Sequence, residues 1–179
     1  MRTGDHVRLS GGGLAPVIWA GRRRIDARRH PNPAAVWPVH VPAGAFGANV
    51  PRRDLFLSPD HAIFADDVLI PAKCLIGSGG ISQVAADQIV YHHIELAEHD
   101  VILAEGLGCE SFLDTGGKTR FERAGDVIHL HPEFTAGATV WETSARAPLV
   151  VTGPKLDAVR RRLTAPAAEA PRRMGGQRG

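Results

Sequence analysis

Short apolar runs separated by turn residues make up most of the chain. Alternation of apolar and polar positions, or clusters of β-branched residues, predicts strands rather than long helices. The 20 glycines and 13 prolines supply the tight turns between them. We therefore expect an all-β fold of many short strands. The expected strands are residues 7–9, 16–19, 36–41, 55–57, 68–71, 81–84, 88–96 and 101–103.

Four details refine this all-β prediction. Gly11, Gly12 and Gly13 lie between the first two strands and predict a hairpin. Strands 88–96 and 101–103 are separated by only a few polar residues, so we expect them to be neighbours. Residues 72–76 fit one helical turn, and residues 127–130 form a weak strand pattern.

Two further segments depart from the strand pattern. The arginine-rich stretch 22–31 contains Pro31 and predicts a solvated connection. Residues 154–163 predict one short C-terminal helix, with proline in the first turn, Asp157 early and three arginines late, as the helix dipole favours. We expect one domain over residues 1–163 and a disordered basic tail over residues 164–179.

Charge and composition exclude several classes of protein. Residues 155–179 hold seven basic residues against two acidic ones, so the net charge of +2 for the whole chain becomes −3 over residues 1–154. A basic tail without interleaved aromatic residues does not favour nucleic-acid binding. The apolar runs are too short for a membrane helix, and residues 1–6 lack the apolar part of a secretion signal. Localisation stays open: cytoplasmic as encoded, or secreted if an upstream segment directs export.

The two cysteines and nine histidines are the residues that bear on chemistry. Cys74 and Cys109 are too few for a disulfide framework, so buried thiols are favoured over a bridge, although both stay open. Ser58 and His61 are three residues apart across a proline turn. A hydroxyl and an imidazole so placed can act on one peptide group, the imidazole donating a proton to the leaving nitrogen. By composition alone, an incidental turn histidine is the favoured interpretation.

Several motifs, in matching order and spacing, support the chemical interpretation. The chain reads Gly-Asp-His-Val at residues 4–7, Leu-Ser-Pro-Asp-His at 57–61, and Ala-Glu-Gly-Leu at 104–107, followed by Glu-Ser-Phe-Leu-Asp-Thr-Gly at 110–116. These motifs resemble those of the Hint family, which includes inteins and the Hedgehog processing domain, and they are closest to its bacterial subfamily. The resemblance covers nearly the whole chain up to Leu163.

The resemblance implies a compact Hint-type β fold and an autoprocessing activity. In the family, a cysteine or serine at the first residue of the domain attacks the preceding carbonyl and forms a thioester or ester, which is then cleaved. Ser58 and His61 match the Thr-x-x-His pair, and His99 matches the histidine of the penultimate strand. His93 falls where many members have aspartate. The implied partner is a fused upstream polypeptide as self-substrate, and no cofactor, nucleic acid or membrane is implied.

Two departures from the family pattern modify that expectation. No residue before Gly4 matches the family's opening Cys-Phe-x-x-Gly-Thr, so we expect a domain lacking its first strands and inactive for want of a nucleophile. An unpaired strand edge would then favour self-association. Glu110 and Ser111 stand where splicing inteins have His-Asn, which makes splicing an unfavoured activity.

Two alternatives come from other functional classes. A Hint body without its nucleophile can serve as a non-catalytic interaction or structural module. A histidine-based metal site is a weaker alternative, because adjacent strand residues such as His92 and His93 point to opposite faces. The sequence also lacks a dense Cys/His motif. The remaining histidines considered for such a site are His99, His129 and His131.

Overall fold

A computed structural model describes residues 1–113 and 145–165 of the chain. Their strands form four small antiparallel sheets, and one helix follows near the C-terminal end, so the all-β prediction is confirmed. The largest sheet has four strands in the order β10-β11-β6-β7. These strands are β10 (Val101–Ala104), β11 (Leu107–Glu110), β6 (Ala62–Ala65) and β7 (Val68–Pro71).

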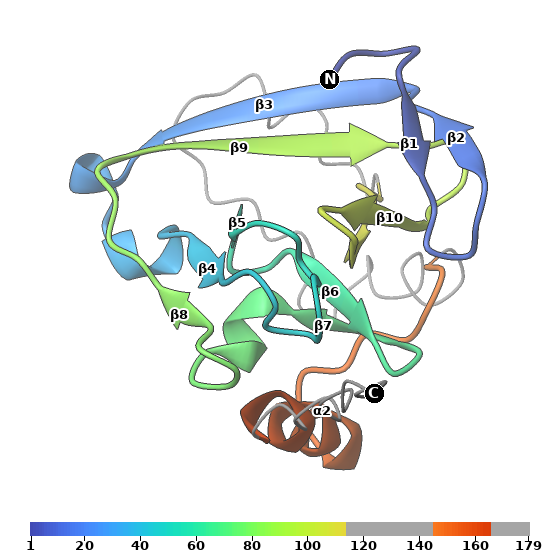
Figure 1. Ribbon diagram of the computed structural model, residues 1–179. Helices are drawn as coiled ribbons and strands as arrows, with labels where there is room; N and C mark the ends of the chain where they lie inside the picture. The colour runs from blue at the N-terminus through green and yellow to red at the C-terminus, as the bar shows by residue number, and fades with distance from the viewer. Residues whose placement is uncertain (114–144, 166–179) are drawn as a thin grey trace, which may run out of the picture.

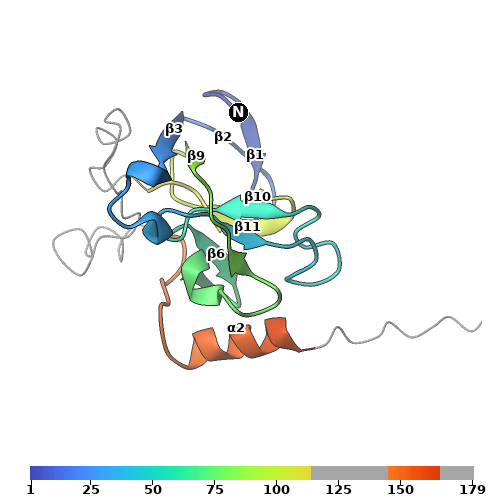
Figure 2. The ribbon, with the colours of Figure 1, turned by 90° about the vertical axis from the view of Figure 1, so that its left-hand side faces the viewer.

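A long two-stranded ribbon lies across one end of the molecule. It pairs β3 (Trp19–Asp26) with β9 (Gln88–Glu95) along their full length. The helix α2 (Pro154–Thr164) lies at the opposite end, with the four-stranded sheet between them (Figures 1 and 2). The inner face of the ribbon is therefore directed toward the middle of the molecule.

Two smaller sheets complete the described structure. The hairpin of β1 (His6–Arg8) and β2 (Leu14–Pro16) turns through Gly12 and Gly13, whose φ values of 96° and 85° favour glycine. The predicted glycine hairpin is thus confirmed. A three-stranded sheet has the order β5-β4-β8, with β4 (Val39–Val41), β5 (Leu55–Leu57) and β8 (Ser82–Gln83).

The main hydrophobic core joins both ends of the chain to the central sheet. Val7 and Val17 from the N-terminal region pack in the same cluster as three residues of α2. The helix begins with Pro154 and contributes Leu156, Val159 and Leu163 as its buried residues, which confirms the predicted C-terminal helix. The 3₁₀ turn Ala72–Leu75 confirms the predicted turn after β7.

Three sequence expectations about the strands were wrong. The arginine run is not a solvated connection, because Arg22, Arg23 and Arg24 lie in β3 and pair with β9. Strands β9 and β10 are not neighbours, because β9 pairs with β3 whereas β10 pairs with β11. The expected strand 16–19 is divided, because β2 ends at Pro16 and β3 begins at Trp19.

The remaining expectations concern residues outside the described ranges, the two cysteines and membrane helices. Residues 127–130 and the tail beyond residue 165 lie outside the described residues. Cys74 and Cys109 are both free thiols, so they do not form a bridge. Within the described ranges, no helix combines the length and the apolar character needed to cross a bilayer.

Candidate functional site

The turn between β5 and β6 carries Ser58 and His61. The His61 N–H donates to the Ser58 carbonyl at 3.1 Å, which closes the turn that Pro59 initiates. Two hydrogen bonds from the 3₁₀ turn Ala72–Leu75 also fix the Ser58–His61 turn. The Ala72 N–H donates to the His61 carbonyl, and the Lys73 N–H donates to the Pro59 carbonyl, each at 2.9 Å. The local backbone therefore fixes the relative positions of the hydroxyl and the imidazole.

The Ser58 hydroxyl is buried without a hydrogen-bond partner. Its Oγ atom is shielded from solvent, and none of the residues that the structure describes donates to it or accepts from it. A buried polar atom without a partner costs free energy, and such sites are frequently functional. This hydroxyl is therefore available to bind a group that enters the site.

His93 lies on the inner face of the ribbon and meets the Ser58–His61 turn. The ring centroids of His61 and His93 are 6.3 Å apart, and the edge of Phe112 contacts the His93 ring at a centroid distance of 5.9 Å. His93 is only 7% exposed, whereas His92 beside it is exposed on the outer face. The prediction that these two histidines point to opposite sides is confirmed.

Burial lowers the pKa of His93 from its ordinary 6.5 to about 3. Loss of hydration is the main cause, and positive charge on His61, Arg23 and His92 lowers it further, while Glu110 opposes them. His93 is therefore a neutral imidazole at physiological pH. The site thus brings a buried neutral histidine next to His61, which is more exposed.

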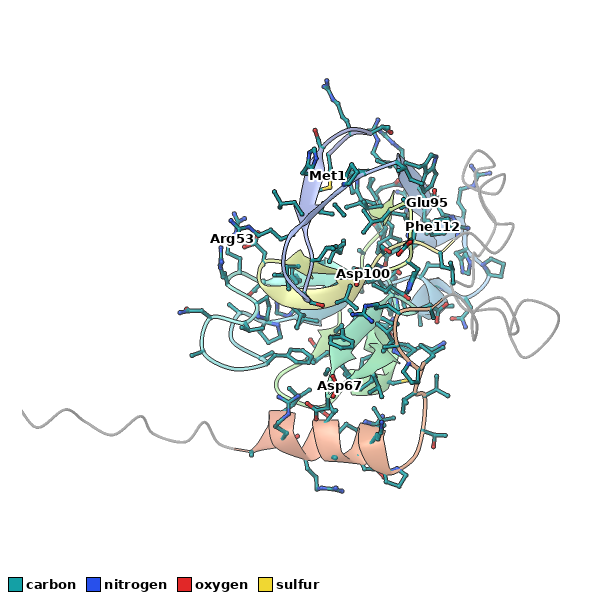
Figure 3. The ribbon with its side chains drawn as sticks, turned by 90° about the vertical axis from the view of Figure 1, so that its right-hand side faces the viewer. Met1, Arg53, Asp67, Glu95, Asp100 and Phe112 are labelled. Atoms are coloured by element: carbon teal, nitrogen blue, oxygen red, sulfur yellow. The ribbon has the colours of Figure 1, made fainter. Side chains whose placement is uncertain are left out.

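Aromatic side chains close one side of this pair. Phe112 follows β11, and its N–H donates to the Ile94 carbonyl at 2.6 Å, which places it beside the end of β9 (Figure 3). The Trp19 ring packs against Phe112 with centroids 5.4 Å apart. These rings shield His93 from water on the side of the ribbon.

His99 is held by a different set of neighbours. Its Nδ1 accepts the backbone N–H of Arg146 at 3.1 Å, and the Arg146 guanidinium pairs with Asp100 at 3.3 Å. In the neutral ring this bond leaves the hydrogen on Nε2. The structure thus brings Ser58, His61 and His93 together, while a role for His99 in the site rests on the resemblance alone.

Glu110 lies at the candidate site, although no local pattern in the sequence predicts it there. Its carboxylate is buried, accepts the Ala62 N–H at 2.7 Å, and acts electrostatically on His93. The signal in the sequence was an acidic residue directly after the apolar Leu107-Gly108-Cys109 stretch. Its contact with the Ser58–His61 turn is long-range, so this signal alone does not predict it.

A sequence model described as a Hint domain matches residues 1–116. The chain belongs to the Hint domain family. The matched region contains every described strand and all of the residues of the site, and it ends before α2. Searches of curated proteins and of solved structures returned no match.

Neither cysteine of this Hint domain is suited to attack a peptide bond. Cys109 is buried in β11, and burial raises the pKa of its thiol to about 12. Cys74 is half-buried, which also raises the pKa of its thiol. Since the thiolate is the reactive form, both cysteines are poor nucleophiles at neutral pH.

The described part of the Hint domain contains no cluster typical of a metal site. Within residues 1–113 and 145–165, no three His, Cys, Asp or Glu side chains converge as ligands would. His129 and His131, which entered the metal hypothesis, lie outside these ranges.

Proposed function

We propose that this chain is the body of an autoprocessing Hint domain that acts on the peptide bond joining it to a preceding polypeptide. The observation that carries the proposal is the unpartnered, buried Ser58 hydroxyl on the turn that also carries His61, whose ring lies 6.3 Å from that of His93. The hydroxyl would hydrogen-bond the reacting peptide group. His61, the more exposed imidazole, would donate the proton that the departing nitrogen requires.

The chemistry divides between the two imidazoles. A cysteine thiol or serine hydroxyl attacks the preceding carbonyl carbon, the C–N bond breaks, and a thioester or ester forms. His93 stays neutral and can only accept a hydrogen bond from the nucleophile, whose proton passes to water, while His61 supplies a proton to the new amine. Water then hydrolyses the ester and releases the preceding polypeptide as a carboxylic acid.

The start of β1 is held near this end of the ribbon. Gly4 N–H donates to the Val17 carbonyl, and Ile18 N–H donates to the carbonyl of Glu95 at the end of β9. A polypeptide that leads into Gly4 would therefore approach the ribbon end nearest His93. This supports a self-substrate as the partner.

In this proposal the nucleophile is a cysteine or serine at the start of a segment that leads into Met1, and the bond that breaks is the one directly before that residue. The buried thiols of Cys74 and Cys109 do not supply it. We therefore expect the chain alone to be inert toward peptide bonds, and to cleave only when a cysteine or serine is placed ahead of it.

A fusion protein tests the proposal directly. A reporter is joined to Met1 through a segment with the family's Cys-Phe-x-x-Gly-Thr pattern, and release of the reporter is followed by mass spectrometry. We expect hydroxylamine to accelerate release, and Ser58→Ala and His61→Ala each to slow it about 100-fold or more. His92→Ala is the matched control, because His92 lies on the outer face of the same strand.

The outcomes separate this function from its main alternative. If the parent fusion and the His61→Ala fusion release the reporter at the same rate, or neither releases it, the autoprocessing proposal fails. An inert but stably folded fusion would instead favour a non-catalytic interaction module.

A further inference from the structure

Glu110 ties the end of β11 to the Ser58–His61 turn. Strand β11 meets β6 at Cys109 and Ile63, and the next N–H on β6 belongs to Ala62. That N–H donates to the Glu110 carboxylate at 2.7 Å instead of to a backbone carbonyl. Since Ala62 directly follows His61, the side chain of Glu110 fixes the backbone from which the His61 imidazole projects.

The position of Glu110 also requires a compensating positive charge. The residue is 5% exposed, and a buried carboxylate is costly unless it is hydrogen-bonded and paired. The charged or titratable groups that act on His93 are Glu110 from β11, His61 from the turn, and Arg23 and His92 from the ribbon. Glu110 is the one among them whose charge favours a protonated imidazole.

We propose that Glu110 is a positioning residue of the autoprocessing site, which holds the Ser58–His61 turn and stabilises the proton carried by the His61–His93 pair. This inference rests on the proposed function. Glu110 itself touches no substrate: it acts through Ala62 on geometry and through the imidazoles on charge.

Three substitutions separate the two effects. Glu110→Gln keeps an oxygen that can accept the Ala62 N–H but removes the charge. Glu110→Asp keeps the charge on a shorter side chain, and Glu110→Ala removes both. Glu98→Gln is the matched control, because Glu98 is an exposed acid in the loop between β9 and β10.

The first measurement is the rate of reporter release from the fusion across roughly pH 5 to 9. Cleavage needs a protonated imidazole, so the rate falls as pH rises through the midpoint of the pair. In Glu110→Gln we expect that midpoint to move down by about one pH unit, because a stabilising negative charge is lost. Glu110→Asp should restore the midpoint, and Glu110→Ala should also lose rate at every pH. Glu98→Gln should leave the profile unchanged.

The second measurement does not depend on cleavage. NMR titration of the histidine rings in the chain without a fusion follows protonation of the pair directly, and amide spectra report whether each variant is folded. The midpoint should fall in Glu110→Gln and return in Glu110→Asp. If one variant fails to fold, the other still tests whether charge at this position sets the midpoint.

The two measurements distinguish the two proposals. A parent fusion that never cleaves, with the NMR shift present, would remove the proposed function and leave the electrostatic coupling of Glu110 to the pair. A parent fusion that cleaves, with neither the rate profile nor the NMR midpoint altered in Glu110→Gln, would overturn the role of Glu110.

Discussion

At the scale of single residues, the neighbouring imidazoles of His61 and His93 lie in different environments. Both belong to the same residue type, yet His93 is buried under Phe112 and beside Arg23, while His61 is more exposed on a turn. Pairs of titratable groups in contrasting environments are typical of acid–base sites. For the proposed function, this contrast favours His61 as the proton donor and keeps His93 neutral.

The lowered pKa of His93 makes folding stability depend on pH. Above pH 6.5 the imidazole is neutral in both the folded and the unfolded chain. As pH falls below 6.5, the unfolded chain binds a proton that the folded chain rejects until about pH 3. The free energy of unfolding should therefore decrease by about 1.4 kcal/mol per pH unit, or about 2 kcal/mol between pH 6.5 and 5.

Chemical denaturation at several pH values checks this prediction. His93→Gln should flatten the pH dependence by that amount, because the substituted residue does not titrate. His92→Gln, on the exposed face of the same strand, should keep the slope of the parent chain. Equal slopes in the parent chain and His93→Gln would contradict the assignment of a buried neutral His93.

Gly21 is required because the Trp19 ring covers it. A Cβ atom at residue 21 would overlap the six-membered part of the indole ring, which packs against Phe112. We expect Gly21→Ala to lower the free energy of unfolding by about 1–3 kcal/mol. Gly11→Ala is the control, because a Cβ there meets nothing within 4 Å, and its effect should stay within about 0.5 kcal/mol. Similar midpoints of urea unfolding for both variants would show that the ring moves freely.

The sequence identified part of this site and missed the rest for a physical reason. Ser58 and His61 are local to one turn, so their spacing was visible along the chain. Glu110 reaches the same turn across nearly fifty residues, through a hydrogen bond between β11 and β6. Long-range contacts of this kind leave no local pattern in a single sequence.

At the scale of elements, β3 shows how pairing overrides a run of like charges. Arg22 and Arg24 point outward and are exposed, while Arg23 between them points inward and is 7% exposed. Read along the chain, three arginines indicate a solvated segment. The register with β9 instead satisfies their backbone groups, and this register depends on residues far along the chain.

The alternation in β3 gives a test at this scale. Arg23→Ala removes a buried side chain from the inner face of β3, and we expect it to lower the free energy of unfolding by about 3 kcal/mol. Arg22→Ala and Arg24→Ala should each change it by less than about 0.5 kcal/mol. Thermal unfolding of the three variants tests this prediction. An equal loss of stability at all three positions would mean that β3 is not a half-buried strand.

An element can be predicted from the sequence when the residues that indicate it lie within the element itself. Helix α2 has proline in its first turn, an acid early and arginines late, and these features belong to the helix itself. The short strands β6 and β11 were not predicted, because four residues without alternation resemble a loop with apolar positions.

At the scale of the whole molecule, α2 and the N-terminal hairpin close one core from its two ends. Leu156 is 3% exposed and belongs to the same cluster as Val7. We expect Leu156→Ala to cost about 2–5 kcal/mol, the range for truncating a buried leucine. Lys155→Ala, exposed on the same helix turn, is the control and should be nearly neutral. Matching denaturant midpoints for the two variants would contradict the packing of α2 on the core.

Self-association of the chain stays a prediction that sizing experiments can test.

The shared core also sets an order of events during synthesis. Val7 is made long before Leu163, which also follows every residue of the proposed site. While the ribosome still holds the last helix, the cluster around Leu75 and Ile81 lacks its cover. The chain therefore completes its fold only after nearly all of it has been translated. An activity that depends on this fold would start only once α2 has left the ribosome, so a preceding segment would not be cut off while this part of the chain is still being made.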